Sequence, residues 1–191
     1  MQNRLNIKDV DFNGLDLVKK SSHGILTRQV FYDKHNDEYI KTWNKDYYWN
    51  LFVNKANIIG IYKNLTLLKN LLYDDEGNIR GYISKAGILA NTLEKRFRHP
   101  DRLLLENADK QNKQYQSFMK RLYRAMDKKS FVYLDLIPNK LAEVNGKYYL
   151  FDIEPLVFIE DLSRIHTYKR LLFYCPDDYR KKTQELIKNR Y

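Results

Sequence analysis

An Asn-Gly dipeptide at Asn145–Gly146 constrains the fold of this chain more than any other feature. Asn-Gly between strand-forming segments is the strongest short-range signal for a two-residue β-hairpin turn, because both residues adopt positive φ readily. The flanking segments, 140–144 and 147–151, contain the branched and aromatic residues that favour strands. A hairpin brings the chain before its first strand and after its second strand to the same end, so those two outer segments should meet.

Oxygen-bearing side chains occupy both of these outer segments. Asp135 and Asn139 precede the hairpin, and Asp152 and Glu154 follow it. Such side chains can hold a divalent cation and orient a hydroxyl group, which phosphoryl transfer requires. Glu154 would share a strand face with Asp152, because side chains alternate with a period of two. The alternative is that Asp135 is an ordinary turn residue, since Asp and Asn are common in turns.

The composition is that of a folded chain with an excess of positive charge. Its 191 residues, 43% hydrophobic and 30% charged, suit one domain or two small lobes. The net charge of +10 favours an anionic partner, such as a nucleotide, a phosphorylated substrate or nucleic acid. Cys175 is the single cysteine, which excludes a disulfide framework within the chain. Because no apolar run is long enough for a signal peptide or a membrane span, we expect a soluble cytoplasmic protein without a membrane partner.

The first part of the chain predicts an antiparallel sheet with one helix. Short runs of strand-forming residues alternate there with polar and Gly-containing turns. We expect strands over 15–18, 26–32, 39–43, 67–73 and 79–84, and a helix over 46–57. These elements would form an N-terminal lobe that ends near Lys85.

The second part predicts a larger share of helix. Its clearest signal is a set of apolar residues at helical spacing, which is typical of a core-facing helix. The members are Tyr115, Phe118, Met119, Leu122, Tyr123 and Met126. A strand over 131–134 should follow, and a basic helix over 176–191 should begin near Asp177 or Asp178.

Together, these elements and residues resemble the protein-kinase-like superfamily, including its branch of choline-kinase and aminoglycoside-phosphotransferase type. The resemblance covers roughly residues 15–160. It depends on Lys41 in the third strand, on the loop that carries Asp135 and Asn139, and on Asp152, thirteen residues after Asn139. It implies a two-lobed α+β fold, with an antiparallel-sheet N-lobe over 1–85 and a reduced, mainly helical C-lobe over 86–191.

The resemblance also implies cofactors and residue roles. ATP and Mg²⁺ would bind in the cleft between the lobes, and a hydroxyl-bearing acceptor would receive the phosphoryl group. Asp135 would orient or deprotonate that hydroxyl, while Asn139 and Asp152 would bind magnesium. Glu154 would add a metal or substrate contact, and Lys41 would steady the α- and β-phosphates.

Nucleotide contacts are implied at two further places. Gly24, in a reduced phosphate loop over 21–24, would let the backbone approach the phosphates. Ser84 and Ala86 lie in the segment 81–86, whose backbone groups would recognise adenine.

Two departures from the family pattern leave other functions open. The step from Asp135 to Asn139 is four residues, one shorter than usual, and no glutamate follows Lys41 before Glu76. These differences favour a pseudokinase that acts as a regulatory or scaffold module. Basic clusters over 95–98, 120–124 and 180–182 suggest a third function, that of a nucleic-acid-associated factor.

The length of the chain bears on the acceptor. Only 39 residues follow Asp152, too few for the helical subdomain that binds peptide substrates in protein kinases. We therefore expect a small molecule or an unusual macromolecule as the acceptor.

Overall fold

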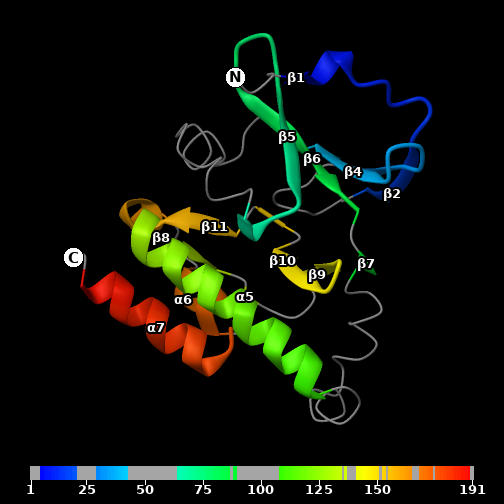
Figure 1. The fold of residues 1–191 in the computed structure, drawn as a ribbon. Coiled ribbons are helices and arrows are strands. Elements are labelled where there is room, and N and C mark those ends of the chain that lie inside the picture. The colour runs from blue at the N-terminus through cyan, green and yellow to red at the C-terminus, as the bar shows by residue number, and fades with distance from the viewer. Residues whose placement is uncertain are drawn as a thin grey trace. The chain divides into compact units, whose positions relative to one another are not determined.

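The chain has an α+β structure, with a six-stranded sheet and several helices (Figure 1). It divides into two compact units, Met1–Lys63 with Leu67–Ala86 (unit 1) and Asn64–Thr66 with Gly87–Tyr191 (unit 2). The computed structural model describes residues 5–20, 29–42, 64–86, 88–89, 108–134, 136, 141–150, 152–153, 155–164, 168–173 and 175–189.

Unit 1 is built on the six-stranded sheet, whose order is β1-β5-β6-β4-β3-β2. All neighbouring strands are antiparallel except β1 and β5, which are parallel. The elements are β1 (Leu5–Asn6), a 3-10 helix η1 (Ile7–Asp9), β2 (Asp16–Lys20), β3 (Gln29–Asp33), β4 (Glu38–Thr42), β5 (Leu68–Tyr73) and β6 (Ile79–Lys85).

The five predicted strands of unit 1 are confirmed as β2 to β6, with ends that differ by at most three residues. The sheet extends to β1, which the sequence did not predict. The predicted helix over 46–57 lies outside the described residues.

Asp side chains close two tight turns in the described part of this sheet. Between β3 and β4, Asp33 Oδ1 accepts hydrogen bonds from the backbone N–H groups of His35 and Asn36, at 2.9 and 3.1 Å. Between β5 and β6, Asp74 Oδ1 accepts from the N–H of Asn78 at 2.7 Å. Gly77 in this second turn has φ +79°, a value that glycine adopts without strain.

One core cluster of unit 1 lies on one face of the sheet. Ile40, Leu72 and Ile83 are buried there. Partly buried apolar residues of the N-terminal segment and β3 pack against them: Leu5, Ile7, Val10, Phe12, Leu15 and Phe31. Neighbouring residues on a strand point to opposite faces, so Lys41 lies on the face away from this cluster.

Unit 2 combines short sheets with helices. Strands β10, β9 and β7 form one sheet, and β11 and β8 form another. The elements are β7 (Ile88–Leu89), α5 (Ala108–Lys129), β8 (Phe131–Tyr133), β9 (Leu141–Val144), β10 (Lys147–Leu150), β11 (Leu156–Phe158), a 3-10 helix η4 (Ile159–Arg164), α6 (Tyr168–Phe173) and α7 (Asp177–Lys188).

The main predictions for unit 2 are confirmed. Val144 pairs with Lys147 across the hairpin, and Asn145 and Gly146 have φ values of +50° and +74°. The predicted apolar stripe lies on α5, with Phe118 among its fully buried members. The C-terminal helix is α7, which has Asp177 and Asp178 in its first turn.

Helices α5 and α7 lie side by side in unit 2 (Figure 1). The rings of Tyr123 and Tyr179 stack with their centres 6.2 Å apart. Lys182 Nζ lies 3.5 Å from Asp127 Oδ1 across the same helix pair. No helix in the described part of the chain is long and apolar enough to cross a membrane.

Candidate functional site

Lys41 lies on β4, an interior strand of the unit 1 sheet, between β3 and β6. Its side chain is buried, with the residue only 5% exposed. Tyr82 is its partner on β6, and Lys41 Nζ lies 5.3 Å from the centre of the Tyr82 ring. An aromatic face attracts a cation, so Tyr82 offsets part of the free-energy cost of burying the ammonium group.

Gly81 allows β6 to approach β4 closely beside Lys41. A Cβ atom at position 81 would lie 2.3 Å from the Lys41 carbonyl oxygen, which is far inside van der Waals contact. A side chain at this position would therefore displace the strand that carries the lysine.

The predicted adenine-recognition segment follows along β6. Ser84 is 1% exposed, and its Oγ has no hydrogen-bond partner among the described residues. The backbone N–H of Ala86 donates to the carbonyl oxygen of Asp37 at 2.9 Å. If Ala86 contacts adenine, it would do so through its carbonyl oxygen, because its N–H is already bonded. The Ser84 hydroxyl is unusual, because buried polar groups are normally hydrogen-bonded.

In unit 2, strand pairing brings the segments on either side of the hairpin together. Leu141, the first residue of β9, pairs with Leu150, the last residue of β10. Tyr133 at the end of β8 pairs with Leu156 at the start of β11. The segment that ends β8 and the segment that follows β10 are therefore neighbours.

Two hydrogen bonds fix this junction, which we define as Tyr133–Leu134 with Asp152–Pro155. The Tyr133 hydroxyl donates to the backbone carbonyl of Asp152 at 2.8 Å. The N–H of Leu134 donates to the carbonyl of Pro155, also at 2.8 Å. Just beyond the junction, the N–H of Leu136 donates to Cys175 Sγ at 3.3 Å. The backbone is thus held on both sides of position 135 in the sequence.

Tyr179 of α7 closes the other edge of β8 at the junction. Its hydroxyl accepts a hydrogen bond from the Tyr133 N–H at 2.8 Å and donates one to the Tyr133 carbonyl at 2.9 Å. Both tyrosines are fully buried. Burial raises the pKa of Tyr179 far above its ordinary value, so this hydroxyl stays protonated and can keep donating.

The structure describes half of the predicted site residues. Lys41, Ser84 and Ala86 lie in unit 1, and Asp152 lies, half-buried, at the junction in unit 2. The others lie outside the described residues: Gly24, Asp135, Asn139 and Glu154. Among the described residues, no group of three or more His, Cys, Asp or Glu side chains could hold a metal ion. The magnesium site therefore stays a prediction.

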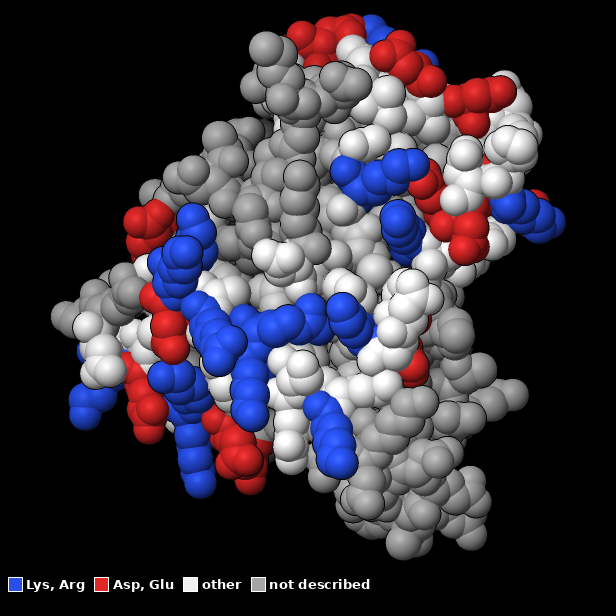
Figure 2. Space-filling view, viewed as in Figure 1, with Lys and Arg blue, Asp and Glu red and all other residues white. Residues whose placement is uncertain are grey.

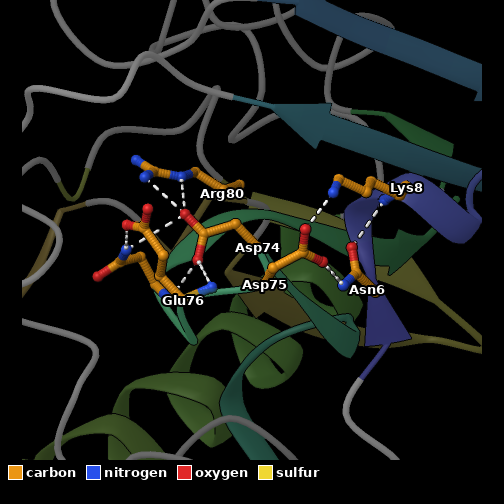
Figure 3. A network of polar contacts seen from close by, with 7 residues as sticks. Asn6, Lys8, Asp74, Asp75, Glu76 and Arg80 are labelled. Atoms are coloured by element: carbon orange, nitrogen blue, oxygen red, sulfur yellow. Dashed lines mark hydrogen bonds and ion pairs between the residues drawn. The ribbon is translucent and has the colours of Figure 1, made fainter.

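Sequence reasoning missed a charged network in unit 1, which joins the N-terminal segment to the β5–β6 turn (Figure 3). Asp75 accepts from Asn6 Nδ2 at 2.7 Å and forms an ion pair with Lys8. Arg80 Nη2 lies 2.6 Å from Asp74 Oδ2. The only local signal was the acidic turn beside Arg80, because Asn6 and Lys8 are nearly seventy residues away in the sequence.

The network borders a pocket of about 640 Å³, whose walls include Phe12 and Phe31. Burial alone would raise the pKa of Asp74, but hydrogen bonds from Asn78 and Arg80 together hold it below its usual range. The carboxylates of the network are thus ionised and satisfied by neighbouring donors. We interpret the network as a structural clamp on the N-terminal segment, because protein groups already use its charges.

Comparison with known proteins does not assign the chain to a family. No family model matches it, and no curated protein matches it significantly. Any functional proposal must therefore be argued from the residues themselves.

Proposed function

We propose that this chain is an ATP- and magnesium-dependent phosphotransferase of the protein-kinase-like type, acting on a hydroxyl acceptor. Unit 1 would bind the nucleotide, with Lys41 at its phosphates. Unit 2 would supply Asp135 to orient the acceptor hydroxyl. Asn139 and Asp152 would hold magnesium, with Glu154 as a further metal or substrate contact.

The observation that carries this proposal is the junction in unit 2. Phosphoryl transfer needs a hydroxyl-orienting group and metal ligands at fixed positions, since its catalysis is largely positioning and electrostatic stabilisation. The junction bonds the backbone beside Asp135 to the segment that contains Asp152. Leu134, which precedes Asp135 in the sequence, is thereby bonded to the segment that follows Asp152.

Unit 1 supports the nucleotide half of the proposal. A lysine is rarely buried unless a charge or an aromatic ring compensates it, and Lys41 is buried on an interior strand against Tyr82. Ser84 adds a buried hydroxyl that has no hydrogen-bond partner among the described residues. A polar base group of such a ligand would bond to the Ser84 hydroxyl, and its phosphates would complement the positive charge of Lys41.

Substitution of Asp152 with Asn tests the metal role directly. The Tyr133 hydroxyl contacts the backbone carbonyl of Asp152, so the variant keeps that hydrogen bond. We expect magnesium-dependent phosphate release from ATP to fall by about 10²–10³-fold, on the scale of losing one main electrostatic stabiliser. Glu143→Gln, on β9 of the same hairpin, removes one negative charge in the same way and should retain activity.

Two results would count against the proposal. Unchanged ATP turnover in the Asp152→Asn variant would remove Asp152 from the mechanism. A thermal-shift experiment on the wild-type protein distinguishes a phosphotransferase from a pseudokinase scaffold, since a ligand that binds the native state stabilises it by mass action. Absence of a shift with ATP, both with and without magnesium, would favour a pseudokinase scaffold.

A further inference from the structure

Helix α5 carries a row of exposed cations on one side. Lys113, Lys120, Arg124 and Lys128 are all exposed, at sequence steps of seven, four and four. These steps keep the four side chains on one helix face, over about 22 Å at 1.5 Å per residue. We call them the α5 stripe. Figure 2 shows Lys and Arg side chains gathered over the part of unit 2 where α5 runs.

In the described part of the chain, none of the four residues of the α5 stripe forms an ion pair. The exposed Asp127 of the same helix is close to Lys182 on α7 instead. Arg121 does not belong to the stripe, because its guanidinium donates to the carbonyls of Asn64 and Tyr148.

Like charges four residues apart destabilise a helix. Two such pairs occur in the stripe, Lys120 with Arg124 and Arg124 with Lys128. Helix α7 provides an internal comparison, because its exposed Asp177, Lys181 and Glu185 alternate in sign at steps of four, as an ordinary solvated face does.

We propose that the α5 stripe binds the phosphate backbone of double-stranded nucleic acid without sequence specificity. A regular row of cations complements a polyanion whose charges also recur regularly. The exposed positions between the cations are Gln116, Ser117 and Asp127, all of them polar. The stripe therefore lacks the apolar side chains that would insert into a membrane surface and the aromatic platforms on which single-stranded bases stack. This inference is independent of the proposed phosphotransferase activity.

The test is fluorescence anisotropy of the full chain with a labelled duplex of about 20 base pairs, over a range of salt concentrations. Four phosphate contacts predict a slope of log K against log salt of about −3.6, so affinity should fall about 150-fold between roughly 50 and 200 mM salt. An unlabelled single strand of the same sequence and anionic vesicles serve as competitors.

The double variant Lys120→Gln with Arg124→Gln should reduce the slope to about −1.8 and weaken binding on the order of 50-fold near 0.1 M salt. The matched control is Lys181→Gln with Lys188→Gln, which removes the same charge from α7. It should leave the slope within about 0.5 of the wild-type value. Circular dichroism and thermal midpoints establish that both variants fold.

Equal losses in the two double variants would show a general effect of net charge and overturn the assignment to α5. A wild-type slope near zero, stronger binding to the single strand, or binding to anionic vesicles with none to the duplex would each overturn it as well.

Discussion

The hydroxyl group of Tyr179 should contribute strongly to the stability of unit 2, and Tyr179→Phe removes it while keeping the ring. The hydroxyl is bonded to both the N–H and the carbonyl of Tyr133, and both residues are fully buried. The substitution therefore leaves one backbone donor and one backbone acceptor buried without this partner. Each such group costs about 1–3 kcal/mol, so we expect the free energy of unfolding to fall by about 2–6 kcal/mol.

Equilibrium unfolding in urea, followed by far-UV circular dichroism, measures this change. With an m-value of about 2 kcal/mol/M, a loss of about 3 kcal/mol would lower the midpoint by about 1.5 M. Tyr123→Phe is the matched control. Its ring stacks against Tyr179 on the same helix pair, but its hydroxyl has no hydrogen bond to a described residue. The control should change the free energy by less than about 0.5 kcal/mol.

The comparison can fail in two ways. A Tyr179→Phe variant within about 0.5 kcal/mol of the wild type would mean that water or a small rearrangement satisfies the Tyr133 backbone. An equal loss in Tyr123→Phe would attribute the effect to packing between α5 and α7 and not to the hydrogen bonds. Either result would refute the account of how α7 holds the end of β8.

Three further predictions concern stability. Gly81→Ala should lower the free energy of unfolding by about 1–3 kcal/mol in urea titrations, because the added Cβ would lie 2.3 Å from the Lys41 carbonyl oxygen. An unchanged urea midpoint would show that β4 and β6 can move apart without loss of stability. Ser84→Ala should raise the free energy of unfolding of the ligand-free protein by about 1 kcal/mol, since it removes a buried hydroxyl that has no hydrogen-bond partner among the described residues. The same variant should show a smaller thermal shift with ATP. A lower free energy of unfolding would instead show that the hydroxyl stabilises the fold. Burial raises the pKa of Tyr179 in the native state above the value of about 10 that a tyrosine has in the unfolded chain. The stabilisation that the protonated hydroxyl provides is therefore fully present below pH of about 10 and is lost as the pH rises above it. The free energy of unfolding should decline above pH of about 10, and less steeply in the Tyr179→Phe variant than in the wild type. Equal slopes in the two proteins would show that Tyr179 does not cause the decline.

Features with a local physical cause were predictable from the sequence. The Asn145–Gly146 turn follows from the positive φ values that both residues tolerate, and it fixes the register of β9 and β10. The spacing of Phe118, Leu122 and Met126 predicted the buried face of α5, because residues four apart lie on the same side of a helix. In both cases the signal lies within a few residues, where pattern and structure are directly coupled.

Features that depend on distant pairing were not predictable. Strand β11 has three residues and exists because Leu156–Phe158 pairs with β8, more than twenty residues earlier. The contacts of Tyr179 and Cys175 with the end of β8 span about forty residues, and neither residue has a sequence pattern that indicates them. The N-terminal segment that covers the unit 1 sheet contains mostly isolated apolar residues and only a short 3-10 helix.

The junction links these distant contacts to the proposed chemistry, and it separates a structural role from a catalytic one. Tyr179 acts on the backbone of Tyr133, and Tyr133 in turn holds Asp152 through its backbone carbonyl. Neither contact involves the Asp152 carboxylate. If that carboxylate serves phosphoryl transfer, Asp152→Asn should reduce turnover by about 10²–10³-fold with a small change in the free energy of unfolding. Tyr179→Phe should greatly lower the free energy of unfolding. Its turnover, measured at a temperature where the variant stays folded, should fall much less than that of Asp152→Asn. A carboxylate that served only to cap the segment after β10 would give the opposite result, since Asp152→Asn would then change stability and leave turnover unaltered.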